Sequence, residues 1–324
     1  MDGIATGPQG PLSRVLRRWG VLAPRSSLGK AMAPSVAPAS QPVLKDLDAQ
    51  GLFVIGAARS GTTVLQNALN DSHDVFLFGE PSFHDDPGSA DFARRYNGMH
   101  RAWGNQENKS SFCPPLFDGD ATWRHYLDRL ASMHRYVGSK IVINPEHAAR
   151  ACESVFDFQC RNFYRAHYIF TFRHPVDVLM STRGLAELSG YEAVSHEVIL
   201  GSFLRIMGLY IRMLRNLPFV TSVFHEHMDA RAFRQLGSWL DIDLARAASY
   251  YDDARVRHYS MEQLPGHVQP LAADVVRIYE DLRAQAEAGF DLIQLEQNAG
   301  NFSPGHATAL GALNRRIEQR LASV

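Results

Sequence analysis

Cysteine is scarce in this chain of 324 residues, which contains only three. Cys113, Cys152 and Cys160 form no CxxC pair and their number is odd, so they predict buried thiols rather than a disulfide framework or a zinc site. Free thiols are typical of a reducing compartment, and we therefore expect a cytoplasmic protein. No cluster of metal-ligating residues stands out in the sequence, so we expect no metal cofactor.

Long hydrophobic runs and an excess of charge are also missing. No apolar run approaches the roughly 20 residues of a membrane-spanning helix, and the first residues do not resemble a secretory signal. The 33 Lys and Arg residues nearly balance the 34 Asp and Glu residues, which gives a net charge of −1. Nucleic-acid-binding domains usually carry a strongly basic surface, so the composition does not support a nucleic-acid partner. With 45% hydrophobic residues, the chain can build a large globular core.

Residues 1–45 are rich in Pro, Ala, Ser and Gly, and Asp2 is their only acidic residue. We interpret this region as a flexible basic leader. Within it, residues 12–22 (LSRVLRRWGVL) could form a short amphipathic helix that contacts a membrane surface or a partner. The Arg-rich, acid-poor composition is also typical of an organelle transit peptide, and this alternative stays open.

The most informative stretch is residues 51–70, GLFVIGAARSGTTVLQNALN. Its apolar run at 52–55 predicts a strand that stops at Gly56. A loop of small residues follows, and the apolar residues then recur at the spacing of one buried helix face. The stretch therefore predicts a strand, a phosphate-binding loop and a helix.

The loop follows the Gly-x-x-x-x-Gly frame of nucleotide-binding loops, from Gly56 to Gly61. Thr62 stands where a Walker-A loop carries Lys, and the cation of this loop is instead Arg59. Backbone N–H groups at a helix N-terminus form an anion site, so we expect phosphate or sulfate binding. The missing Lys argues against the usual kinase or ATPase arrangement. A strand, turn and helix that merely pack together remain the alternative.

Four more apolar runs, at 74–79, 136–143, 167–172 and 219–225, predict further strands. Their separation by helical patterns predicts a three-layer α/β/α fold with a central parallel sheet, similar to P-loop nucleotide-binding proteins. Helices are expected at 121–135, 195–217, 270–296 and 308–321.

Three candidate catalytic residues follow or interrupt these strands. Glu80 follows the strand at 74–79 and would lie at the ligand-binding rim of the sheet, where a carboxylate could serve as a general base. Lys140 interrupts the strand at 136–143, and a buried Lys needs an anionic partner or a path to solvent. His147 opens a helix at the same rim. An exposed loop Glu and a His that caps or packs the start of a helix remain the alternatives at positions 80 and 147.

A second anion site is predicted at the end of the strand at 167–172. Arg173 emerges directly from that strand, Pro175 fixes the first turn of a helix, and Ser181 lies about two turns further along. An Arg fork and a hydroxyl that converge on one site suit a phosphate distinct from the first.

Together, GAARSGTTVL (56–65) and FRHPVDVLMS (172–181) resemble the two cofactor signatures of sulfotransferases that use 3′-phosphoadenosine 5′-phosphosulfate. The resemblance implies that the 5′-phosphosulfate of this donor is held by Arg59, Ser60, Gly61, Thr62 and Thr63. It implies that Arg173 and Ser181 hold the 3′-phosphate. Glu80-Pro81 is similar to the position of a catalytic carboxylate in several Golgi-type and bacterial members.

The resemblance weakens elsewhere in the chain. Lys140, Pro145 and His147 are similar to the Gly-x-Lys-Thr-Pro segment of the family, but Ile-Val-Ile-Asn stands between Lys140 and Pro145, so the roles of Lys140 and His147 stay open. Residues 226–228 (EHM) fall where many members have Tyr-Glu-Asp-Leu. No Arg-Lys-Gly segment is present, and Arg255 and Arg257 only lie in the approximate region, so no third contact to the 3′-phosphate is assigned.

The resemblance implies a sulfotransferase that moves a sulfonate from 3′-phosphoadenosine 5′-phosphosulfate to a hydroxyl of a small-molecule, glycan or lipid acceptor. Glu80 would be the base, and Arg59, Lys140 and His147 would assist. A nucleotide-dependent phosphotransferase and a non-catalytic nucleotide-binding protein are the alternatives. The expected domain spans 46–300, with an aromatic-rich acceptor-side insertion at about 83–120, and residues 301–324 form a tail or helix. Acceptor identity and oligomeric state stay open.

Overall fold

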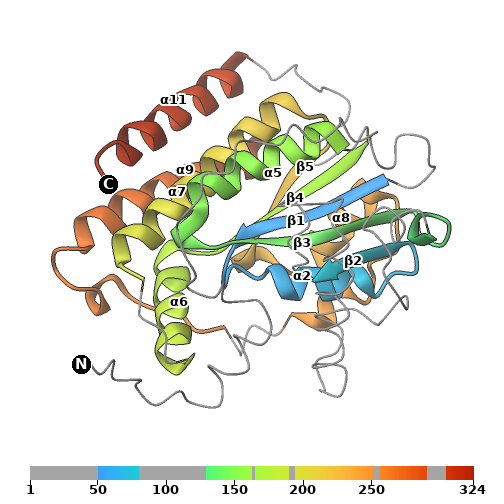
Figure 1. Ribbon diagram of the computed structural model, residues 1–324, viewed down its shortest axis with the longest axis horizontal. Helices are drawn as coiled ribbons and strands as arrows, with labels where there is room; N and C mark the ends of the chain where they lie inside the picture. The colour runs from blue at the N-terminus through green and yellow to red at the C-terminus, as the bar shows by residue number, and fades with distance from the viewer. Residues whose placement is uncertain (1–49, 80–128, 163–164, 190–193, 252–255, 290–303) are drawn as a thin grey trace, which may run out of the picture.

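The structure is a computed structural model that describes residues 50–79, 129–162, 165–189, 194–251, 256–289 and 304–324 (Figure 1). Several predictions lie outside these residues: the leader, the insertion at 83–120, most of the helix expected at 121–135, and Glu80. Within the described part, every helix is too short or too polar to cross a lipid bilayer.

A five-stranded sheet forms the centre of the fold, and all of its strand pairs are parallel. The strand order is β2-β3-β1-β4-β5. The strands are β1 (Gln50–Ala57), β2 (Val75–Gly79), β3 (Tyr136–Ile143), β4 (Ala166–Phe172) and β5 (Val220–Phe224). The last strand ends one residue earlier than predicted because His225 already belongs to a 3-10 turn, η3 (His225–His227).

Helices cover both faces of this sheet. One face packs against α2 (Thr62–Asn70), α8 (Ala230–Leu240) and the 3-10 turn η4 (Ala247–Tyr250). The other face packs against α5 (Ala148–Asn162), α6 (Pro175–Ser189), α7 (His196–Asn216) and α9 (Gln269–Gly289). The strands are buried on both faces, as their near-continuous apolar sequences require. This arrangement confirms the predicted three-layer α/β/α fold.

A further helix, α11 (Pro304–Leu321), packs on the outside of α7 and α9 (Figure 1). It begins before the predicted start at residue 308, and it buries Leu310, Leu313 and Ile317. The predicted helix at 195–217 is α7, and the one at 270–296 is α9 as far as residue 289.

The order of the strands decides where a ligand can bind. From β1 the chain passes to β2 on one side, whereas from β4 it passes to β5 on the other side. The neighbouring strands β1 and β4 therefore form the point at which the direction of winding reverses. In open α/β sheets, ligands bind at the carboxyl ends of the strands at such a point.

Edge strand β2 is held by the side chain of Asn70 at the end of α2. Its amide accepts from the backbone N–H of Leu77 at 2.7 Å and donates to the carbonyl of the same residue at 3.0 Å. Gln66 donates to that carbonyl as well, at 3.0 Å. These bonds satisfy the outer side of the sheet edge and fix the strand that leads to Glu80.

Candidate functional site

The loop between β1 and α2 has two residues in the left-handed backbone region, Arg59 at φ 70° and Gly61 at φ 92°. A Cβ atom at Gly61 would lie 2.6 Å from Cδ2 of His225, so only glycine fits there. The helix that follows has no side-chain cap and no acidic residue in its first turn. The first N–H groups of a helix have no partner within the helix, so this N-terminus offers N–H groups and a positive dipole end, which favour an anion.

Ser60 is fully buried and braces the loop. Its hydroxyl donates to the carbonyl of Ala57 at 2.8 Å and pairs with the hydroxyl of Thr171 in β4 at 2.9 Å. A Cβ atom at Gly56 would lie 2.5 Å from this hydroxyl, so Gly56 leaves the space that Ser60 occupies. The side chain of Ser60 thus fixes the loop, whereas Arg59, Gly61, Thr62 and Thr63 line a pocket.

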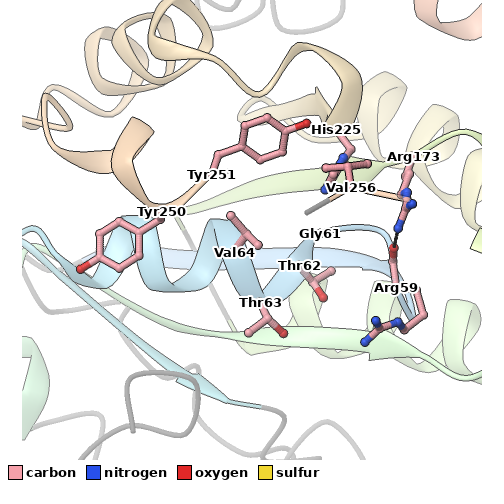
Figure 2. Close-up of a pocket in the computed structure, with 10 residues that line it drawn as sticks. All are labelled: Arg59, Gly61, Thr62, Thr63, Val64, Arg173, His225, Tyr250, Tyr251 and Val256. Carbon is pink, nitrogen blue, oxygen red and sulfur yellow. Dashed lines mark hydrogen bonds between the residues drawn. The ribbon is translucent and has the colours of Figure 1, made fainter. Parts of the chain in front are cut away.

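The two signature segments meet beside this loop. Nε of Arg59 donates to Oγ of Ser181 on α6 at 3.0 Å. Nη1 of Arg173 donates to the carbonyl of Arg59 at 3.5 Å (Figure 2). Burial lowers the pKa of Arg59, and the positive charge of Arg173 lowers it further. Two guanidinium groups on adjacent strand ends therefore repel each other, and a bound anion would relieve that repulsion.

Glu226 holds the backbone just after Arg173. Its Oε1 accepts from the N–H of His174 at 2.6 Å, and its Oε2 accepts from the hydroxyl of Tyr279 at 2.8 Å. Burial and the charge of Glu226 raise the pKa of Tyr279, so this hydroxyl stays a donor. Residues 226–228 fall at the position of a family segment, but no role was predicted for them from the sequence. This link between β5, α6 and α9 depends on tertiary packing.

The pocket has a volume of about 340 Å³ and two chemically different ends (Figure 2). Arg59, Arg173 and the start of α2 form a cationic end. The rest is lined by Val64, His225, Tyr250, Tyr251 and Val256. Such a pocket suits a ligand with anionic groups at one end and a flat ring at the other.

His225 joins the two ends of the pocket. Its ring meets that of Tyr251 edge to face, with the centroids 5.1 Å apart. Burial, followed by the charge of Arg173, lowers the pKa of His225, so the ring stays neutral beside the cations. Four residues of the pocket were not predicted from the sequence: His225, Tyr250, Tyr251 and Val256. His225 is the last residue of the strand predicted at 219–225, and only its place at that strand end pointed to this rim. Tyr250, Tyr251 and Val256 lie in short segments without strand or helix periodicity.

Lys140 and His147 occupy different environments. Lys140 is 2% exposed, and its Nζ donates to Oγ1 of Thr63 in the first turn of α2 at 2.9 Å. It is paired in the sheet with Gly79, the last described residue before Glu80. His147 is exposed on the 3-10 turn η2 (Pro145–His147), which packs against α7, and it is not among the pocket residues. The fold thus brings Lys140, but not His147, next to the pocket.

No group of three or more His, Cys, Asp or Glu residues in the described part of the chain could hold a metal ion. The one cysteine whose side chain is described, Cys152, is buried, and burial raises the pKa of its thiol to about 12. It lies in α5, outside the pocket.

These features define an α/β protein with a glycine-containing loop and two Arg side chains at the reversal point of a parallel sheet. The Sulfotransferase family model matches residues 51–215, just over half of the chain, and the chain belongs to this family. The matched region includes both signature segments and Lys140. It ends before β5, so His225 and both tyrosines of the pocket lie beyond it.

Two solved structures are similar to this chain. The sulfotransferase domain from the olefin synthase of Synechococcus PCC 7002 has 18% identity and a TM-score of 0.46, and the match covers 82% of this chain and 98% of that one. The sulfotransferase domain from the curacin biosynthetic pathway has 13% identity and a TM-score of 0.44, with coverages of 70% and 97%. No match was found among curated proteins.

Proposed function

We propose that this sulfotransferase uses 3′-phosphoadenosine 5′-phosphosulfate as its donor and transfers the sulfonate to a hydroxyl of a small-molecule, glycan or lipid acceptor. The observation that carries the proposal is the convergence of Arg59 and Arg173 at the uncapped start of α2. The buried Arg173, the neighbouring Arg59 and a helix N-terminus together favour a ligand with more than one negative group.

The donor fits the two ends of the pocket. Its 5′-phosphosulfate would bind the loop amides, Arg59, Thr62 and Thr63 at the start of α2. Its 3′-phosphate would bind Arg173 and Ser181, and its adenine ring would contact Tyr250, Tyr251 and His225, since flat rings pack well on aromatic side chains.

The transfer is a displacement at sulfur. The acceptor oxygen forms a new bond to sulfur while the bond from sulfur to the 5′-phosphate oxygen breaks, and adenosine 3′,5′-bisphosphate leaves. Arg59 and the loop amides stabilise the sulfonate oxygens by charge and orientation. Glu80 accepts the proton of the acceptor hydroxyl. Lys140, beside Thr63, stabilises the charge that develops on the leaving phosphate.

A thermal unfolding assay tests the donor assignment. We expect adenosine 3′,5′-bisphosphate to raise the Tm, because a ligand that binds only the native state stabilises it by about 2.7 kcal/mol at a hundredfold excess over Kd. Adenosine 5′-phosphate should raise the Tm less, and Arg173→Ala should abolish the difference between the two nucleotides. An unchanged Tm with the bisphosphate would refute the proposal, and Mg²⁺-dependent ATP consumption would favour a phosphotransferase.

A further inference from the structure

A buried carboxylate that no signature assigns lies next to Arg173. Asp177, in the first turn of α6, is 2% exposed. Its Oδ2 is 3.6 Å from Nε of Arg173 and 3.1 Å from Nδ1 of His258, and its Oδ1 accepts from the backbone N–H of Tyr259 at 2.8 Å. A buried carboxylate is costly unless it is paired, so these contacts hold its position.

The Arg173 guanidinium is held by protein groups: two backbone carbonyls and the carboxylate of Asp177. Nη2 donates to the carbonyl of Arg257, Nη1 donates to the carbonyl of Arg59, and Nε faces the Asp177 carboxylate. Within the described part of the chain, Nε has no hydrogen-bond partner, so its interaction with Asp177 is an ion pair without a hydrogen bond. These contacts aim the guanidinium at the pocket, which it lines.

The same carboxylate also holds a segment that lines the pocket and is distant in the sequence. Residues 256–259 come more than 70 positions after Asp177 in the sequence, yet His258 and Tyr259 both bind its carboxylate. Val256, at the start of this segment, lines the pocket. One side chain therefore ties the Arg173 guanidinium and the 256–259 segment to the first turn of α6.

We propose that Asp177 is a positioning residue for recognition of the 3′-phosphate, an inference that rests on the proposed function. It acts through Arg173 and the 256–259 segment and does not contact the donor. Its negative charge by itself would repel a phosphate. Removal of Asp177 thus has opposite consequences in two cases: affinity for the 3′-phosphate falls if the carboxylate positions Arg173, and rises if the carboxylate only offsets charge.

Calorimetric titration of the full chain with adenosine 3′,5′-bisphosphate and adenosine 5′-phosphate separates these cases. Asp177→Asn keeps an oxygen that can accept from Tyr259 and removes the charge that faces Arg173. We expect this variant to bind the bisphosphate about tenfold more weakly and the monophosphate within about twofold of wild type. Combined with Arg173→Ala, it should add little further loss, because coupled residues are not additive.

Bisphosphate binding by Asp177→Asn that is unchanged or tighter would overturn the proposal, as would an equal loss for both nucleotides. Asp177→Glu keeps the charge but moves the carboxylate, so it should also lose selectivity for the bisphosphate, and it provides the readout if the Asn variant does not fold. Asp274→Asn is the matched control: it removes a carboxylate of α9 that pairs with Arg320 at 3.0 Å, and it should leave both affinities unchanged.

The two proposals fail differently. If the wild-type protein does not distinguish the bisphosphate from the monophosphate, the donor assignment is wrong and the role of Asp177 falls with it. If the wild type distinguishes them and Asp177→Asn does so equally well, only the role of Asp177 is wrong.

Discussion

Nε of Arg59 donates a hydrogen bond to Oγ of Ser181 at 3.0 Å, although 122 positions separate the two residues in the sequence. The family resemblance assigned them to opposite ends of the donor. In the folded chain, the Arg59 side chain of the first loop instead forms a hydrogen bond with the Ser181 hydroxyl of the second segment. The two segments that were predicted to bind anions therefore lie side by side, and an anion at either segment would compete with this bond or extend it.

Ser181→Ala should weaken binding of adenosine 3′,5′-bisphosphate by about tenfold, because hydrogen bonds to charged groups contribute about 1.5–3 kcal/mol. Fluorescence or calorimetric titration measures this change. Ser181→Thr, which keeps the hydroxyl, should bind more tightly than the Ala variant. Thr182→Val is a matched control, since the neighbouring hydroxyl is buried and has no hydrogen-bond partner among the described residues. Equal affinities of wild type and Ser181→Ala would contradict the assignment.

Glu80→Gln should retain the Tm increase with adenosine 3′,5′-bisphosphate and lose most turnover. A positioned general base typically contributes about a hundredfold or more to the rate. Steady-state rates with an accepted substrate provide the measurement, and Glu187→Gln, at an exposed position of α6, is the control. Near-normal turnover by Glu80→Gln would exclude Glu80 as the base.

Lys140→Met and His147→Gln should differ in kcat. Loss of the Lys140 ammonium should lower kcat by about a hundredfold, as loss of one preorganised transition-state donor does. The folded state should tolerate Met well, because a charge is then no longer buried. His147 is exposed and outside the pocket, so His147→Gln should remain near wild type. The reverse pattern would make His147 the functional residue.

Acid should destabilise the protein through His167, at the start of β4. Burial, followed by the charges of Arg135 and Arg165, lowers the pKa of His167 to about 3. The ring stacks on Phe219, with the centroids 4.6 Å apart. Because the folded-state pKa lies below the unfolded value of about 6.5, the contribution to stability is complete above pH 6.5 and is lost as the pH falls toward 3.

Urea unfolding at two pH values measures this contribution. Between pH 7.5 and 5.5, the free energy of unfolding should fall by about 1.4 kcal/mol. This is the change expected when the pH falls one unit below the unfolded-state pKa of about 6.5. His167→Phe keeps an aromatic ring in the stack and should remove this part of the pH dependence, whereas His147→Gln should not. Parallel stability curves for wild type and His167→Phe would show that His167 is not responsible.

Much of the fold was predictable because its signals are local. Apolar runs between turn residues located all five strands, since each strand of a parallel sheet is buried on both faces. The loop from Gly56 to Gly61 was recognisable because glycine spacing and helix periodicity occur within one short segment. The start of α11 was less predictable, because helix ends depend on weak local signals.

Most of the candidate site required the folded chain. Ser60 shows the difference. The family resemblance implied that it contacts the donor, but its hydroxyl forms a hydrogen bond with the hydroxyl of Thr171 in the neighbouring strand. Asp177 and Glu226 had no assigned role, because their partners come from distant segments. Tyr250 and Tyr251 were missed for the same reason, since no pattern within their own segment indicates a pocket.

The sequence by itself determined the parallel α/β fold, the loop between its first strand and helix, and the second cationic segment, because periodicity, glycine spacing and an Arg at a strand end act over a few residues. The tertiary structure decided which side chains meet: Arg59 with Ser181, Lys140 with Thr63, and Asp177 with Arg173 and Tyr259. Such contacts depend on strand order and on the direction of each side chain, and both are set by packing between segments far apart in the chain.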